Sequence, residues 1–164
     1  MIMNEQTPGE SGIASSVGDG HSSKRVELVR KFFSTDLTSD EWVDMFAIDG
    51  VKEVPFALPD MTFKWDGRDA LQESRRINSR RNWSNVEHLN LEIYPTSDDE
   101  VFFVLSQMDA RLDDRPYVQN YVHMLQFRNE KIVLYREWFN PLRLLDTRGG
   151  TIGFAEGDTF TNPR

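Results

Sequence analysis

Residues 117–141 read YVQNYVHMLQFRNEKIVLYREWFNP, and this stretch decides the fold. Polar and apolar side chains alternate along Tyr117–Arg128 and again along Lys131–Phe139, a spacing typical of β-strands. Asn129-Glu130 between them indicates a tight turn, and Asn140-Pro141 ends the second strand. The stretch therefore predicts an antiparallel hairpin of two long strands.

The sequence before this hairpin predicts two more long strands next to it and, still earlier in the chain, three helices. Residues 86–94 and 101–112 are strand-like, with turn-forming residues after each. Apolar spacing predicts helices from Lys24 to Ser34, from Thr38 or Ser39 to Asp49-Gly50, and from Arg68 to Arg81, with short strands at 51–56 and 61–65. Helices followed by a meander predict an α+β fold. We expect a cone-shaped α+β barrel, whose curved antiparallel sheet wraps on three N-terminal helices around a one-ended pocket.

Length and composition set the domain plan and exclude several classes of function. The 164 residues fit one domain at 24–145, with a disordered leader at 1–23 and a C-terminal tail at 146–164. The chain has no cysteine and a net charge of −8, which disfavours thiol chemistry and nucleic-acid binding. We expect a cytoplasmic protein without a membrane span, without a metal and without a cofactor, because no metal-ligand or phosphate-loop motif occurs.

The strands carry the candidate catalytic groups. Tyr135, Glu137 and Phe139 share one face of the last strand, and Tyr121 and His123 share one face of the strand before it. If these faces line the pocket, desolvation would hold Glu137 neutral as a general acid, and His123 could carry protons. The alternatives are a surface ion pair for Glu137 and a packing role for His123.

Two further candidates lie elsewhere. Asp49 ends the second predicted helix and is either a base or a turn residue in Asp-Gly. Trp83, where the strand pattern begins, is a candidate substrate-binding residue together with Tyr121 and Tyr135.

Several of these motifs resemble the phenazine biosynthesis A/B family of the nuclear transport factor 2-like/ketosteroid isomerase superfamily. The chain has a Tyr-x-x-x-Tyr-x-His strand, at 117–123, and the ending Arg-Glu-Trp-Phe-Asn-Pro, at 136–141. The segments 46–50 and 67–71 are also similar, and the resemblance covers about residues 25–145.

The resemblance implies a cofactor-free, homodimeric enzyme that acts on a small molecule. Family members assist imine-forming condensation of aminocyclohexenone-type molecules, and Glu137 matches their catalytic glutamate as the protonator of a carbonyl or carbinolamine oxygen. Arg68 stands where phenazine-forming members have a histidine. Since arginine cannot shuttle protons at neutral pH, we expect Arg68 to bind a substrate carboxylate or an enolate oxygen.

Two other classes of function stay open. One is a SnoaL-like polyketide cyclase, isomerase or hydratase, with Asp49 or His123 as the base. The other is a non-catalytic ligand-binding module, because the fold alone does not give a function. For the homodimer, we expect the interface on an apolar sheet face formed by Val104, Met108, Val122, Met124, Leu134 and Trp138.

Overall fold

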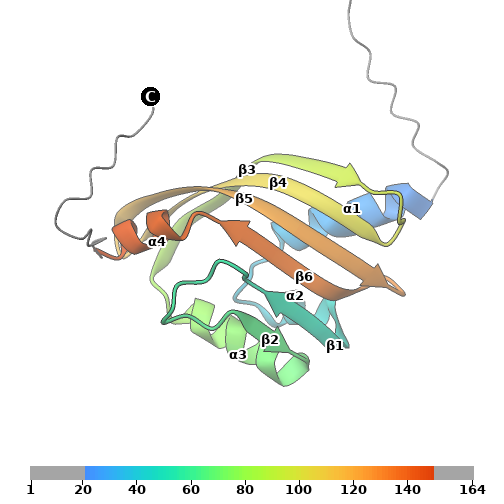
Figure 1. The fold of residues 1–164 in the computed structure, drawn as a ribbon, viewed down its shortest axis with the longest axis horizontal. Coiled ribbons are helices and arrows are strands. Elements are labelled where there is room, and N and C mark those ends of the chain that lie inside the picture. Colours follow the sequence, from blue (N-terminus) through green and yellow to red (C-terminus); the bar gives the residue numbers. More distant parts are fainter. Residues whose placement is uncertain (1–20, 150–164) are drawn as a thin grey trace, which may run out of the picture.

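The computed structural model describes residues 21–149 (Figure 1). The predicted leader falls almost entirely on residues 1–20, which lie outside the described residues, as do residues 150–164 of the predicted tail. The elements, in chain order, are α1 (His21–Ser34), α2 (Asp40–Asp44), β1 (Phe46–Glu53), β2 (Lys64–Asp66), α3 (Arg68–Ser79), β3 (Trp83–Pro95), β4 (Val101–Leu112), β5 (Arg115–Arg128), β6 (Lys131–Phe139) and α4 (Pro141–Thr147).

One curved sheet organises the described part of the chain. Its strand order is β2-β1-β6-β5-β4-β3, with β1 parallel to β6 and every other neighbouring pair antiparallel. Helices α1, α2 and α3 lie on one side of this sheet, while no helix from residues 21–149 covers the opposite face of β3–β6 (Figure 1). This is the expected α+β cone, and the predicted hairpin of β5 and β6 lies in its middle.

The segment after α2 differs from the sequence prediction. The helix ends at Asp44, and residues 46–53, including Asp49-Gly50, form β1. A Cβ at Gly50 would stand 2.9 Å from the Ile132 carbonyl oxygen, so only glycine lets the two strands approach this closely. The prediction that Asp49-Gly50 ends a helix is therefore wrong, because pairing with β6 overrides the local helix signal.

The chain continues from the last strand into α4, which crosses the predicted boundary between the domain and the tail at residues 145 and 146. Asn140 caps α4 by accepting a hydrogen bond from the Leu142 backbone N–H, and Pro141 occupies the first turn. Proline is favoured there because its missing N–H would have no partner inside the helix. Leu144 then packs under the sheet beside Met108 and Tyr117, so α4 belongs to the folded domain.

The core lies on the inner face of the sheet, between β4–β6 and the helices. Its main cluster includes Val29, Phe32, Trp42, Val43, Phe46, Leu71, Phe102, Val104, Leu125, Phe127, Ile132 and Tyr135. Our placement of Val104 and Met108 on the outward face was wrong, because both are buried. Val104 pairs directly with His123 and Met108 with Gln119, and residues directly opposite each other share a face of the sheet.

None of the helices between residues 21 and 149 has the length and apolar character needed to span a bilayer.

Candidate active site

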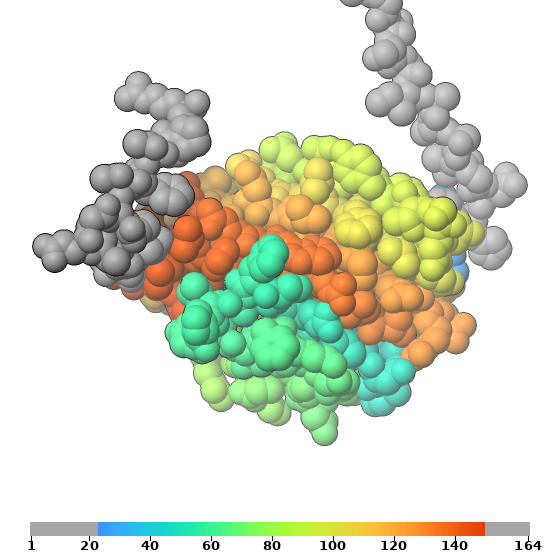
Figure 2. Space-filling view, viewed as in Figure 1, coloured from blue at the N-terminus to red at the C-terminus, as the bar shows by residue number. Residues whose placement is uncertain are grey.

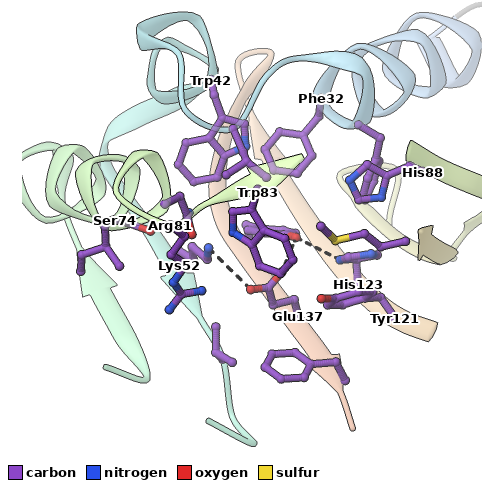
Figure 3. A pocket seen from close by; sticks show the side chains of 18 of the residues that line it. Phe32, Trp42, Lys52, Ser74, Arg81, Trp83, His88, Tyr121, His123 and Glu137 are labelled. Carbon is purple, nitrogen blue, oxygen red and sulfur yellow. Dashed lines mark hydrogen bonds and ion pairs between the residues drawn. The ribbon is translucent and has the colours of Figure 1, made fainter. Parts of the chain in front are cut away.

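A pocket of about 120 Å³ lies between the inner face of the sheet and the helices. Strands β1, β5 and β6 supply about half of its polar groups, and aromatic rings such as Trp42 and Trp83 supply much of the wall (Figure 3). A cavity of roughly 150 Å³ in another protein accommodates benzene. The pocket therefore has room for about one six-membered ring.

An ion pair between Lys52 and Glu137 forms the centre of the pocket. The Lys52 Nζ lies 3.5 Å from Glu137 Oε1, and the two side chains are 9% and 17% exposed. Three rings surround the ammonium, with centroids 5.1 Å away at Trp65, 5.5 Å at Trp42 and 5.9 Å at Tyr135. Aromatic faces attract a cation, so these three rings help to hold the ammonium group in place.

A chain of hydrogen bonds continues from Glu137 into the core. The Tyr135 hydroxyl donates to Glu137 Oε2 over 2.8 Å and lies 3.0 Å from His123 Nδ1. His123 Nε2 in turn lies 2.9 Å from the Ser106 hydroxyl oxygen. An ionised carboxylate only accepts, so the Tyr135 proton points to Glu137 and Tyr135 accepts from His123 Nδ1–H. His123 Nε2 is then an acceptor, and the Ser106 hydroxyl donates to it.

The pair with Lys52 decides the charge of Glu137. Desolvation raises the pKa of this carboxyl, but the Lys52 charge, the nearby His123 ring and the hydrogen bond from Tyr135 together outweigh it, so the pKa lies below its usual value. We had expected desolvation to keep Glu137 neutral as a general acid, and this expectation was wrong. The sequence showed the aromatic surroundings of Glu137, but Lys52 lies 85 positions earlier and reaches it only through the β1–β6 pairing.

His123 is a neutral, fully engaged group. Burial lowers the pKa of its ring to about 3, and both ring nitrogens have partners within the chain of hydrogen bonds. Its ring also stacks between Tyr121 and Tyr135, with centroids 5.4 and 5.8 Å away. This arrangement favours an orienting role for His123 over the proton-carrying role that we considered from the sequence.

Of the other predicted site residues, Tyr121 and Trp83 line the pocket, whereas Asp49 and Arg68 do not. Asp49 lies on the surface, where its carboxylate accepts two hydrogen bonds from Arg128, one of them 2.7 Å long. Arg68 begins α3 and pairs with Asp44. Neither residue lines this pocket. The predictions failed because the local sequence signals that singled them out did not fix the direction of their side chains.

Sequence reasoning missed three basic residues that line the pocket: Lys52, Arg81 and His88. Lys52 had one usable signal, since it alternates with the buried Val54 and so faces inward. Arg81 follows α3, and its guanidinium makes no hydrogen bond or ion pair with the side chains of residues 21–149. Burial and the nearby charge of Arg148 lower the pKa of Arg81.

The charged groups that line the pocket sum to one positive charge. Lys52 and Arg81 are cationic, Glu137 is anionic, and His123 is neutral. Burial lowers the pKa of His88 as well, and its Nδ1 has no hydrogen-bond partner among the described residues. The pocket thus favours one net negative charge on its contents, although the whole chain has a net charge of −8. Between residues 21 and 149, no group of three or more His, Asp or Glu side chains is placed to hold a metal ion.

The fold and this pocket define a nuclear transport factor 2-like α+β protein. A solved phenazine biosynthesis-related protein of Pseudomonas aeruginosa, PhzB2, superposes with a TM-score of 0.70 at 20% identity over 85% of this chain and 96% of that one. A nuclear transport factor 2-like protein of Burkholderia xenovorans superposes with a TM-score of 0.62 at 18% identity over 76% and 95% of the two chains. Likenesses at this level of identity establish the fold.

The sequence comparison establishes the family. An uncharacterized PhzA/B-like protein of Pseudomonas aeruginosa is 30% identical over 117 residues, which are 70% of this chain and 82% of that protein. No protein-family model matches the sequence. Because of its 30% identity to the PhzA/B-like protein, the chain belongs to the PhzA/B-like family.

Proposed function

We propose that this protein is a cofactor-free acid–base enzyme in which Glu137 removes a proton next to the carbonyl group of a small ketone. The single observation that carries the proposal is the placement of the Glu137 carboxyl group in an aromatic pocket, where it pairs with Lys52 and accepts a hydrogen bond from Tyr135, both of which lower its pKa. A carboxylate removed from bulk water is a competent general base when a ligand displaces the remaining solvent. Isomerisation, dehydration or cyclisation each begins with such a step.

The size of the pocket favours a reaction of one molecule over condensation of two. About 120 Å³ holds one ring, whereas phenazine-type condensation joins two ring systems. Condensation would require the walls to open further when the second molecule enters. We therefore place isomerisation or cyclisation of a single carbonyl compound ahead of the imine-forming condensation that the family resemblance implied.

Arg81 takes the substrate-binding role that the sequence gave to Arg68. A half-buried guanidinium that makes no hydrogen bond or ion pair with the side chains of residues 21–149 gains from an anionic ligand, because the ligand replaces lost hydration with paired hydrogen bonds. Trp83 and Tyr121 would pack on the apolar part of the same ligand. This division leaves Glu137 free to act at the carbonyl end.

The experiment is solvent deuterium exchange on a panel of small cyclic ketones and enones, followed by mass spectrometry. We expect the protein to speed exchange at the carbon beside the carbonyl, and Glu137→Gln to lower that rate by about 100-fold or more. Asp49→Asn is the matched control, because it removes a carboxylate outside the pocket and should leave the rate unchanged. The proposal fails if the Glu137→Gln rate equals the wild-type rate, or if no member of the panel exchanges faster than in buffer.

We also propose a homodimer through the outer face of the sheet. Figure 2 looks onto this face, where no helix covers β3–β6. This face carries four apolar side chains that are each 37–39% exposed: Phe103, Leu105, Val118 and Val122. Together they form a large apolar patch for a surface in contact with water.

We expect Leu105→Asp to shift the mass measured by light scattering from dimer to monomer. The control Leu142→Asp, on α4, should keep the dimer. A wild-type mass equal to one 19.1 kDa chain would contradict the proposal.

A further inference from the structure

The Lys52 ammonium does not use all of its hydrogen-bonding capacity on the side chains of residues 21–149. An ammonium group carries three N–H donors, yet its nearest carboxylate oxygen lies at 3.5 Å, longer than an ordinary N–H···O bond. Three aromatic rings lie around it, with centroids 5.1 to 5.9 Å away, and rings attract the charge without accepting a directed hydrogen bond of full strength. The side chain is nevertheless turned into the pocket (Figure 3).

The backbone holds this ammonium in a defined place beside Glu137. Lys52 pairs with Tyr135 in the parallel register between β1 and β6, and Glu137 is the next inward residue along β6. Two side chains fixed on neighbouring strands can therefore face the same ligand. An oxygen bound at Nζ places the adjoining carbon of the ligand next to the Glu137 carboxylate.

We propose that Lys52 is the electrophilic group of the site and binds the oxygen on which negative charge develops when Glu137 takes the proton. The inference rests on the proposed function and adds a residue and a substrate requirement to it. The substrate is a carbonyl compound with an acidic C–H bond, and the species that the pocket binds best is its enolate.

The step balances within the pocket. Glu137 Oε1 takes the proton, the electrons of the broken C–H bond form a C=C bond, and the carbonyl π pair moves onto oxygen. Lys52 then faces the enolate oxygen in place of the carboxylate, which has become a neutral acid. Return of the same proton to another carbon completes an isomerisation. A cation whose surrounding rings are already in place needs no rearrangement as the charge moves, which is how such groups lower a barrier.

The test uses para-nitrophenol, a one-ring acid whose phenolate imitates the enolate and differs in colour from the phenol. Binding to the full-length protein should favour the phenolate and lower the apparent pKa of the probe. Glu137→Gln should bind the phenolate at least about tenfold more tightly, because the competing negative charge is gone. Lys52→Met in the Glu137→Gln background should remove at least that gain, and Lys52→Arg should retain part of it.

Three outcomes would overturn the inference. The first is equal phenolate affinity of Glu137→Gln and the double variant Lys52→Met/Glu137→Gln. The second is a loss of phenolate affinity in Arg81→Met and not in Lys52→Met, which would place the phenolate oxygen at Arg81. The third is a wild-type protein that binds no phenolate at millimolar probe. The double variant removes both buried charges together, so its folding does not depend on an unpaired carboxylate. An unchanged exchange rate in Glu137→Gln would refute the proposed function but leave the binding of an oxyanion at Lys52 as a separate result, since phenolate binding is measured without turnover.

Discussion

Strand β1 contributes to two ion pairs, and their comparison separates a site from a surface contact. Lys52 pairs with Glu137 at 3.5 Å in the pocket, while Asp49, three residues earlier, pairs with Arg128 at 2.5 and 2.7 Å. The closer pair is more than half exposed, so water screens it and it contributes little. The longer pair is nearly buried, where the same charges interact strongly and fix the ionisation of Glu137. Surroundings, more than distance, decide which pair has chemical consequences.

The largest contrast should appear when each pair loses its cation. Lys52→Met leaves the buried Glu137 carboxylate without its counter-charge and should lower the free energy of unfolding by about 3 kcal/mol. Arg128→Met should change it by no more than the error of a urea titration. Equal stability of the Lys52→Met variant and the wild type would mean that the pocket is wetter than the structure indicates.

The hydrogen-bond chain behind Glu137 should give the fold a pH dependence. The folded pKa of His123 is about 3, below its ordinary value of 6.5, so its contribution is complete above pH 6.5 and is lost as the pH falls toward 3. Over that window the unfolded state binds the extra proton. We expect His123→Gln to flatten the decline in unfolding free energy by up to ~1.4 kcal/mol per pH unit.

Chemical denaturation at a series of pH values checks this, with His88→Gln for comparison, because burial also lowers the pKa of His88. Parallel curves for wild type and His123→Gln would show that the ring takes up its proton in the folded state.

A smaller effect should come from Tyr135→Phe, which removes the hydroxyl that donates to Glu137. This hydrogen bond favours the carboxylate, so its loss raises the pKa of Glu137. The acid limb of the deuterium-exchange rate should therefore move to higher pH, by about one unit. If the exchange rate of Tyr135→Phe falls at the same acidic pH as that of the wild type, Tyr135 does not influence the ionisation of Glu137.

The smallest effects should be at the surface pairs. Arg68→Met breaks only the pair with the exposed Asp44, and we expect exchange rates and para-nitrophenol binding to match the wild type. A tenfold loss of either would show that the α3 N-terminus reaches the ligand, and would restore the role that the sequence suggested for Arg68.

The sequence predicted the strands better than the segments between them. Alternation alone placed Val101–Leu112 and Lys131–Phe139 with the bounds that the structure has, because a strand with one buried face repeats every two residues. The sequence prediction failed at Phe46–Asp49, where helix-like spacing continues into residues that form β1. It also failed for the inward face of β4, because both faces of that strand carry apolar residues.

By itself, the sequence determined an α+β meander, a glutamate among aromatic residues at position 137, and membership of a family. Local periodicity and short motifs carry that information, since each depends on neighbours within a few residues. Tertiary structure alone decided that Glu137 is a carboxylate and that Asp49 and Arg68 lie outside the site. Those outcomes depend on β1 lying against β6, a contact between residues more than 80 positions apart that brings Lys52 to the acid. Ionisation is set by the charges that surround a group in space, and no run of adjacent residues states which charges those are.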